Sequence, residues 1–186
     1  MDIRLSWDLF VLVFFGIVIA YSFIIGRNQT LKIIIATYMA ILSADGLGNI
    51  FQMYVFPQMP TLQGTEADTA LIFLKIFVFV LAIVLIAIKG GFSVDIMFER
   101  SLVTRVLATL TFGFLNAGLI VSTILVYISG ASFVSGTLQI ASDTNLYRES
   151  SFVKVMIDNY NVWFALPAIA IVLISFFEPR QAPPAE

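Results

Sequence analysis

Three polar residues interrupt the long apolar runs of this 186-residue chain: Asp45, Lys75 and Asn116. A charged side chain inside a bilayer is costly, so an Asp and a Lys at one depth are more stable as a pair than apart. The cluster therefore has two interpretations. It lines a path for protons, ions or a small solute, or the Asp and the Lys pair only to hold two helices together, with the Lys stem extending towards the interface. We favour the second interpretation.

The depth of each residue follows from where its helix begins. At 1.5 Å per residue, a helix that begins near Leu31 places Asp45 about 21 Å from one face of a hydrocarbon core of about 30 Å, which is about 9 Å from the other face. A helix that enters at that other face near Thr69 places Lys75 about 9 Å below it. Asn116 lies about 21 Å along the fourth helix by the same arithmetic. We expect all three at one level.

Glycines follow the aspartate of this cluster. Gly46 and Gly48, with Asn49, indicate a break, a tilt or the end of the helix. In transporters such a break exposes backbone groups to a substrate.

The elements that must position these residues are apolar runs of about the 20 residues that an α-helix needs to cross a membrane. Hydrophobic residues make up 60% of the chain and charged residues 12%, against roughly 25% charged in soluble domains. Residues 77–88 are apolar on every side, which argues against alternating strands. We predict an all-α, polytopic integral membrane bundle with four to five transmembrane helices and a short interfacial helix. Its single domain, residues 1–178, has spans at about 8–26, 31–56, 69–89, 104–128 and 161–177, and residues 179–186 form a disordered tail.

Two segments decide the span count. The fifth run is short and contains Pro167, so it either crosses the membrane or adopts a re-entrant or tilted arrangement. Residues 91–105 mix apolar and charged side chains, which favours a helix lying in the interface, and residues 142–161 have a similar mixture. The first run is longer than a signal-peptide core and lacks a cleavage-like end, so we expect it to remain as a span.

The basic residues predict the orientation, because short loops rich in Lys and Arg tend to stay in the cytoplasm. With five spans, one face receives six basic residues and the other receives three. The first set is Arg27, Lys32, Lys89, Arg100, Arg105 and Arg180, and the second is Arg4, Arg148 and Lys154. We therefore expect the N-terminus outside and the C-terminus inside, unless the fifth run fails to cross.

The composition lowers the expectation of catalysis. The chain has no cysteine, which excludes disulfides and thiolate metal sites, and no histidine, the commonest general base and transition-metal ligand. We expect no enzyme activity, no cofactor and no metal. Asp95 and Glu99 have the i, i+4 spacing of a pair of oxygen ligands for a divalent cation, but with Arg100 beside them a solvated charged face is the better interpretation.

The charge also bears on the partners. A net charge of −2 with scattered basic residues argues against nucleic acid. The expected partners are the lipid bilayer and either a second copy of the chain or a larger membrane complex, because a bundle this small commonly needs one to enclose a pore.

Small residues at four-residue spacing suggest close helix contacts. They are Gly16 and Ala20 in the first span, and Gly113 and Ala117 with the adjacent Gly118 in the fourth. Such spacing permits close backbone approach. It also arises by chance in apolar sequences, so both explanations stay open.

The opening WDLFVLVFFGIVIAYSFIIGR resembles the start of the colicin V production protein family of small bacterial inner-membrane proteins. The similarity lies in an acid at the start of the first helix, a Ser and a Gly near its end, and a basic residue in the turn. These are Asp8, Ser22, Gly26 and Arg27. A later Gly-rich helix, with Gly113 and Gly118, and the serines Ser150 and Ser151 are also similar.

The resemblance extends over roughly residues 5–165 and departs from the family pattern in two places. Asn28 and Gln29 follow the turn where the family usually has a glycine, and Asn116 replaces a basic residue. The resemblance implies a multi-pass inner-membrane protein, a non-catalytic accessory or structural subunit linked to toxin production or export, or to envelope maintenance. The alternative is a small channel or transporter that uses Asp45, Lys75 and Asn116.

Overall fold

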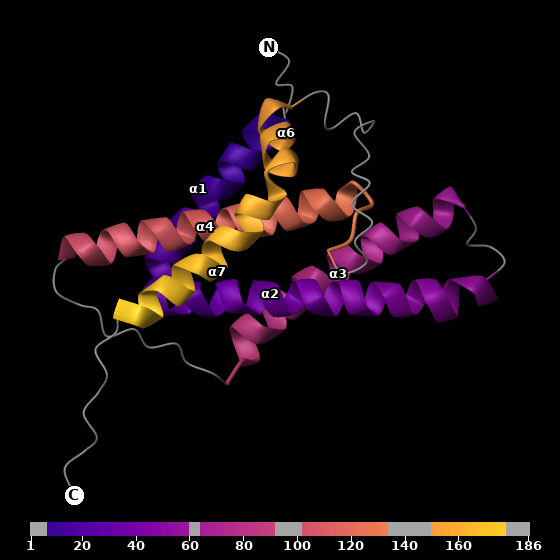
Figure 1. The fold of residues 1–186 in the computed structure, drawn as a ribbon, viewed down its shortest axis with the longest axis horizontal. Helices are drawn as coiled ribbons and strands as arrows, with labels where there is room; N and C mark the ends of the chain where they lie inside the picture. Colours follow the sequence, from indigo (N-terminus) through magenta and orange to yellow (C-terminus); the bar gives the residue numbers. More distant parts are fainter. Residues whose placement is uncertain (1–6, 60–63, 92–101, 134–149, 178–186) are drawn as a thin grey trace, which may run out of the picture.

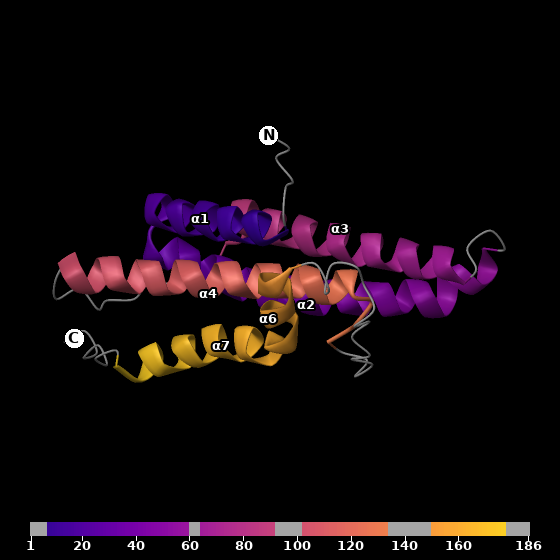
Figure 2. The same ribbon diagram turned by 90° about the horizontal axis from the view of Figure 1, so that it is seen from above.

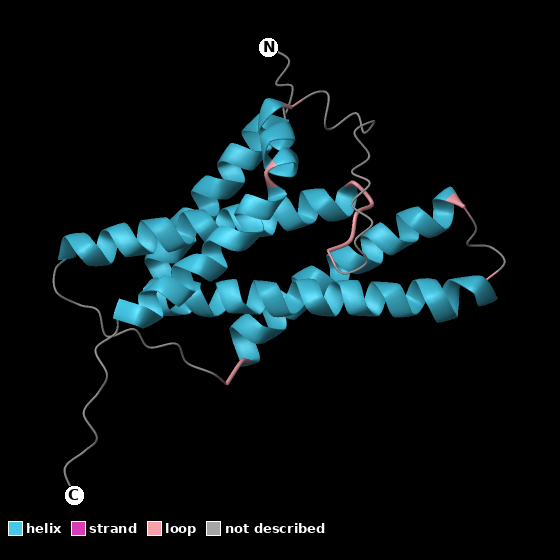
Figure 3. Ribbon diagram, in the orientation of Figure 1, coloured by secondary structure: helices cyan, strands magenta, loops and turns pink. Residues whose placement is uncertain are grey.

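The computed structural model describes residues 7–59, 64–91, 102–133 and 150–177, and the regular elements in these ranges are all helices (Figure 3). The all-α prediction is confirmed. In chain order the elements are α1 (Trp7–Ile25), α2 (Arg27–Ile50), the π-helical turn η1 (Phe51–Val55), the 3-10 turn η2 (Phe56–Gln58), α3 (Thr65–Lys89), α4 (Leu102–Ile128), α6 (Ser151–Asp158) and α7 (Tyr160–Phe177).

Four helical segments are long and apolar enough to cross a membrane: α1, α2 with its continuation to Gln58, α3 and α4. Helices α6 and α7 meet the same criterion only as a pair, and they are bent by 63° at a break between them. The pair is therefore a broken fifth span or a re-entrant segment, which agrees with the prediction of four to five spans. The chain is a multi-pass helical membrane protein.

Parts of the sequence prediction lie outside the described residues. These are the tail at residues 179–186 and most of the interfacial helix at residues 91–105. Within the second mixed stretch, residues 142–161, the chain forms the short helix α6, which buries Val153, Met156 and Ile157 and exposes much of its remainder.

Helix α4 is the centre of the bundle. It contacts α1, α2, α3, α6 and α7, and 72% of the residues in its most apolar stretch are buried, against 11% in α1 and in α3. Figure 2 shows α1 and α3 on one side of the pair formed by α2 and α4, with α7 on the other side. The outward side chains of α1, α3 and α7 are largely apolar and exposed, including Ile24, Ile88 and Phe176. A water-soluble protein rarely exposes so much apolar surface, whereas lipid covers it in a membrane.

A tight turn and a side-chain hydrogen bond fix one end of the bundle. Gly26 alone separates α1 from α2 and has φ +82°, a conformation that glycine adopts without the steric cost of a Cβ. Lys32 Nζ donates a hydrogen bond of 2.6 Å to the carbonyl of Gly90, just after α3. The start of α2 and the end of α3 therefore lie together at this end (Figure 1).

Tyr38 of α2 completes the backbone hydrogen bonding of α7 around Pro167. A proline inside a helix has no N–H and its ring disturbs the preceding turn. The Tyr38 hydroxyl donates to the carbonyl of Phe164 at 2.5 Å and accepts from the N–H of Ala168 at 3.1 Å. These two groups are four residues apart and would bond to each other in a regular helix, so the hydroxyl bridges the interrupted bond.

We expect Tyr38→Phe to destabilise the fold by about 1–3 kcal/mol, because it leaves a carbonyl and an N–H unsatisfied where little water is present. The measurement is equilibrium unfolding of the purified protein in mild detergent. Tyr21→Phe is the matched control, since Tyr21 is exposed on α1. Equal stability of the two variants would show that water or lipid satisfies the α7 backbone without Tyr38.

Candidate functional site

Asp45 of α2 and Lys75 of α3 form an ion pair within the bundle. Lys75 Nζ lies 3.0 Å from Asp45 Oδ1, and the side chains are 5% and 0% exposed respectively. The two helices run in opposite directions and cross each other at an angle, in close contact (Figure 1). The structure thus brings together the two charged residues of the predicted cluster.

The end of α4 supplies the other contacts of this pair. The backbone N–H of Phe133 donates to Asp45 Oδ2 at 2.8 Å. Lys75 Nζ lies 5.7 Å from the centre of the Tyr127 ring, within the range of a cation–π interaction. The hydroxyl of Tyr127 donates to the Ile41 carbonyl at 3.2 Å. The ion pair therefore connects three parts of the bundle: α2, α3 and the end of α4 with the residues after it.

The glycines beside Asp45 do not break the helix, because α2 continues to Ile50. Gly48 instead makes room for the lysine stem. A Cβ at Gly48 would lie 2.7 Å from Cε and 2.9 Å from Cγ of Lys75, both too close for a real contact. No unwound backbone is offered to a substrate at Gly46 or Gly48.

Asn116 is not brought to the pair. It is 2% exposed and lies eleven residues before Tyr127 on α4, which corresponds to about 16 Å along the helix axis. Figure 1 shows α4 beginning well beyond the start of α2 at their shared end, so equal distances along the two helices do not mean equal depths. Its Oδ1 has no hydrogen-bond partner among the described residues.

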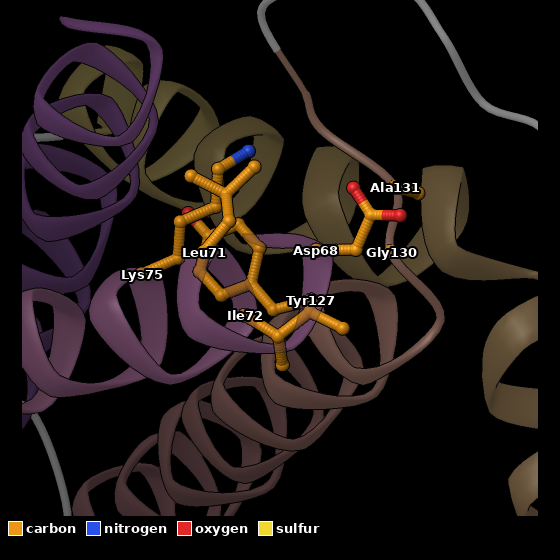
Figure 4. A pocket seen from close by; sticks show the side chains of 7 residues that line it. All are labelled: Asp68, Leu71, Ile72, Lys75, Tyr127, Gly130 and Ala131. Atoms are coloured by element: carbon orange, nitrogen blue, oxygen red, sulfur yellow. The ribbon is translucent and has the colours of Figure 1, made fainter. Parts of the chain in front are cut away.

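A cavity of about 310 Å³ lies against the ion pair. It extends from Asp68, exposed near the start of α3, to the buried Lys75 (Figure 4). The volume is at the lower end of the range for small-molecule sites. The lining residues come from α3, from the end of α4 and from the residues just after it: Asp68, Leu71, Ile72, Lys75, Tyr127, Gly130 and Ala131.

The residues that carry the family resemblance contact one another across the chain. The carboxylate of Asp8 accepts hydrogen bonds from the hydroxyl of Ser150 and, at 3.0 Å, from the N–H of Phe152. Ser150 also caps α6, its hydroxyl accepting from the N–H of Val153 at 3.1 Å. The first turn of α1 is therefore attached to the start of α6.

The other residues of this set lie around the α1–α2 turn. Ser22 packs against Gly113 of α4, where a Cβ would lie 3.0 Å from both Cβ and Oγ of the serine. The Ser22 hydroxyl donates to the Val18 carbonyl at 2.8 Å. Gly26 forms the turn, and Arg27, the first residue of α2, is buried.

The small-residue positions differ between the two spans. In α4, Gly113 contacts α1 closely, Ala117 is fully buried, and a Cβ at Gly118 would overlap the Trp163 ring of α7. In α1, a Cβ at Gly16 would meet nothing within 4 Å, and Ala20 is exposed. The α4 residues therefore allow close approach of both neighbours, while the α1 pair faces away from the other helices that the structure describes.

Sequence reasoning missed Tyr127, Phe133 and the role of Gly48. Tyr127 could have been identified from the sequence as a polar hydroxyl within an apolar run. Nothing local identifies Phe133, whose contribution is a backbone N–H.

Comparison of the chain with known families, curated proteins and solved structures finds no match. The described residues contain no group of three acidic side chains placed to hold a metal ion. Asp95 and Glu99 lie outside those residues.

Proposed function

We propose that this protein is a non-catalytic accessory or structural subunit of the bacterial cytoplasmic membrane, linked to toxin production or export or to envelope maintenance, with its N-terminus outside and its C-terminus inside. The Asp45–Lys75 pair in this proposal stabilises the subunit and moves no solute. The structural role rests on the arrangement of that pair, the link to toxin production or envelope maintenance rests on the family resemblance, and the orientation rests on the basic residues.

Both carboxylate oxygens of Asp45 are engaged, one by Lys75 Nζ and the other by the Phe133 N–H. A group that carries a proton or an ion through a membrane must exchange its partners with water or with the solute. Asp45 is fully buried and is held by both of these partners, so its geometry suits the fixing of helices.

The contacts of the family-like residues support the link to the colicin V production family. Asp8 meets Ser150, and Ser22 meets Gly113, so residues that carry the resemblance in the first helix touch those that carry it in the later half. Such contacts give a physical reason for these residue types to occur together.

The small residues on the exposed face of α1 support a role within an assembly, as a homo-oligomer or beside a larger partner. Gly16 and Ala20 form a small-residue surface on α1 that none of the described helices covers closely. Small residues at this spacing allow close approach of a helix from another chain.

A small channel or transporter is the second candidate, and the cavity beside Lys75 favours it. The cavity has an exposed rim near Asp68 and extends inward to Lys75 of the buried pair. A transporter would need the pair to open towards this cavity during its cycle.

Flux measurements separate the two candidates. We expect liposomes that contain the purified protein to show proton and ion flux equal to that of protein-free liposomes, because the pair is closed on both oxygens. Asp45→Asn should lower the yield of folded protein and leave the flux unchanged. Ser43→Ala on the same helix is the control, since the Ser43 hydroxyl is exposed and, within the described ranges, bonds to the Met39 carbonyl of its own helix.

Flux in the native protein that disappears in folded Asp45→Asn at equal incorporation would replace the subunit proposal with the transporter. Cross-linking in intact membranes then tests the assembly, and a strictly monomeric product at every protein density would contradict it.

A further inference from the structure

The cavity beside the ion pair has charge at both ends and apolar walls between them. Asp68, Leu71, Ile72 and Lys75 occupy positions i, i+3, i+4 and i+7 of α3, so they share one face of the helix. The two charged residues are about 10 Å apart along the axis. The lysine stem shortens this separation, because side chains of a helix tilt towards its N-terminus, where Asp68 lies.

Lys75 retains hydrogen-bonding capacity towards the cavity. An ammonium group has three N–H donors. Asp45 Oδ1 is its ion-pair partner among the described residues, and the Tyr127 ring covers another side. Because Lys75 lines the cavity, an oxygen within it can accept from the same nitrogen. A buried ammonium group is stabilised when its remaining donors are satisfied, so an oxygen acceptor such as a phosphodiester oxygen fits at this end.

The outer rim of the cavity, near Asp68, favours a cationic group instead. Asp68 is exposed near the start of α3, whereas the positive charge of Lys75 is balanced by Asp45. The cavity with its rim therefore carries an excess negative charge, which attracts a cationic group at the outer end. Figure 4 shows the Asp68 carboxylate and the Lys75 ammonium projecting from α3 around the same cavity.

We propose that this cavity binds the headgroup of a zwitterionic phospholipid with a primary ammonium group, such as phosphatidylethanolamine. A phosphodiester oxygen accepts from Lys75 Nζ, and the ammonium group pairs with Asp68. In such a lipid the phosphate joins the glycerol to the amino alcohol, so the ammonium lies nearer to water. Asp68 near the membrane boundary and Lys75 below it present their charges in that order.

The order of the two charges supports a lipid rather than a free zwitterion of the same chemistry, because a phospholipid in a bilayer keeps its phosphate deeper than its ammonium group. Leu71 and Ile72 provide apolar contact between the two charges, where the two methylene groups that join the phosphate to the ammonium group lie. The site is independent of the proposed subunit function.

The test uses the full chain in bilayer discs made of equal parts phosphatidylethanolamine and phosphatidylglycerol. Native mass spectrometry counts the lipids that stay bound after release from the disc. We expect one phosphatidylethanolamine per chain, retained in preference to phosphatidylglycerol. Asp68→Asn should lower that preference by about two- to fivefold, the range for a partly exposed ion pair.

Two further variants complete the design. Glu66→Gln removes an exposed acid from the same first turn without altering the cavity lining, and should retain lipid as the native chain does. Leu71→Trp fills the cavity without changing a charge, and should reduce the retained lipid.

Equal retention of the two lipids by the native chain, or an unchanged preference in Asp68→Asn, would overturn the proposal. Displacement of the bound lipid by soluble phosphoethanolamine would assign the site to a free zwitterion and overturn it as well. Because Asp68 is exposed and outside the buried pair, its variant should fold normally, and the test does not depend on changing Lys75.

Discussion

Asp45→Asn and Lys75→Met are each expected to destabilise the protein by about 3–5 kcal/mol, the largest effect of any single change considered in the bundle. Removing one partner leaves the other as an uncompensated charge or an unsatisfied polar group in a region with almost no exposure to water. Asp45→Asn also weakens the acceptor of the Phe133 N–H, so it loosens the connection after α4.

Thermal or denaturant unfolding in mild detergent measures this loss, together with the fraction of monodisperse protein. Ser43→Ala, on the exposed side of α2, should unfold like the native chain. The exchanged pair, Asp45→Lys with Lys75→Asp, should be more stable than either single charge reversal, although it moves the carboxylate away from Phe133. If the exchanged pair is no better tolerated than the single reversals, Asp45 and Lys75 do not stabilise each other.

Gly118→Ala is expected to cost about 1–3 kcal/mol, in spite of the higher helix propensity of alanine. The added Cβ would overlap the six-membered ring of Trp163, so α7 must move away from α4 or the indole must take another position. The indole also contacts Phe15 of α1 and Phe114 of α4, with ring centres 6.0 and 5.5 Å away, which limits that movement.

The matched control is Gly46→Ala. A Cβ at Gly46 meets nothing within 4 Å, so this change should stabilise the helix by about 0.5–1 kcal/mol. Unfolding of the two variants side by side makes the comparison, and Trp163→Leu should restore part of the stability of Gly118→Ala by vacating the contact. Equal effects of Gly46→Ala and Gly118→Ala would mean that α7 does not pack against Gly118.

Much of the fold was accessible from the sequence because a membrane span is a local property. About 20 apolar residues in a row are sufficient to predict a helix, and the observed helices begin and end within a few residues of the predicted spans. The bounds of α7 match the last predicted span as well, but its bend of 63° from α6 was not predicted, because it depends on packing against α1 and α4.

The candidate site was only partly accessible. Opposite charges inside apolar runs have a strong reason to meet, which is why depth arithmetic identified Asp45 and Lys75. The same arithmetic failed to place Asn116, because it assumes that every helix begins at a common plane, and α4 begins farther out than α2. Glycine spacing alone does not say which face of a helix meets a neighbour, so Gly16 and Gly118 looked equivalent and are not. The Tyr38 bridge to α7 joins residues 126 and 130 positions apart, beyond any local pattern.

The most direct test of the structural role of the ion pair is a double-mutant cycle with Asp45→Leu and Lys75→Met, measured as unfolding free energies in one detergent. If the pair stabilises the bundle, each single change is strongly destabilising, and the double variant regains a large part of the loss because no unpaired charge remains. We expect a coupling free energy of about 2–3 kcal/mol. A coupling within about 0.5 kcal/mol of zero, the ordinary error of additivity, would contradict the account and show that the two residues act independently.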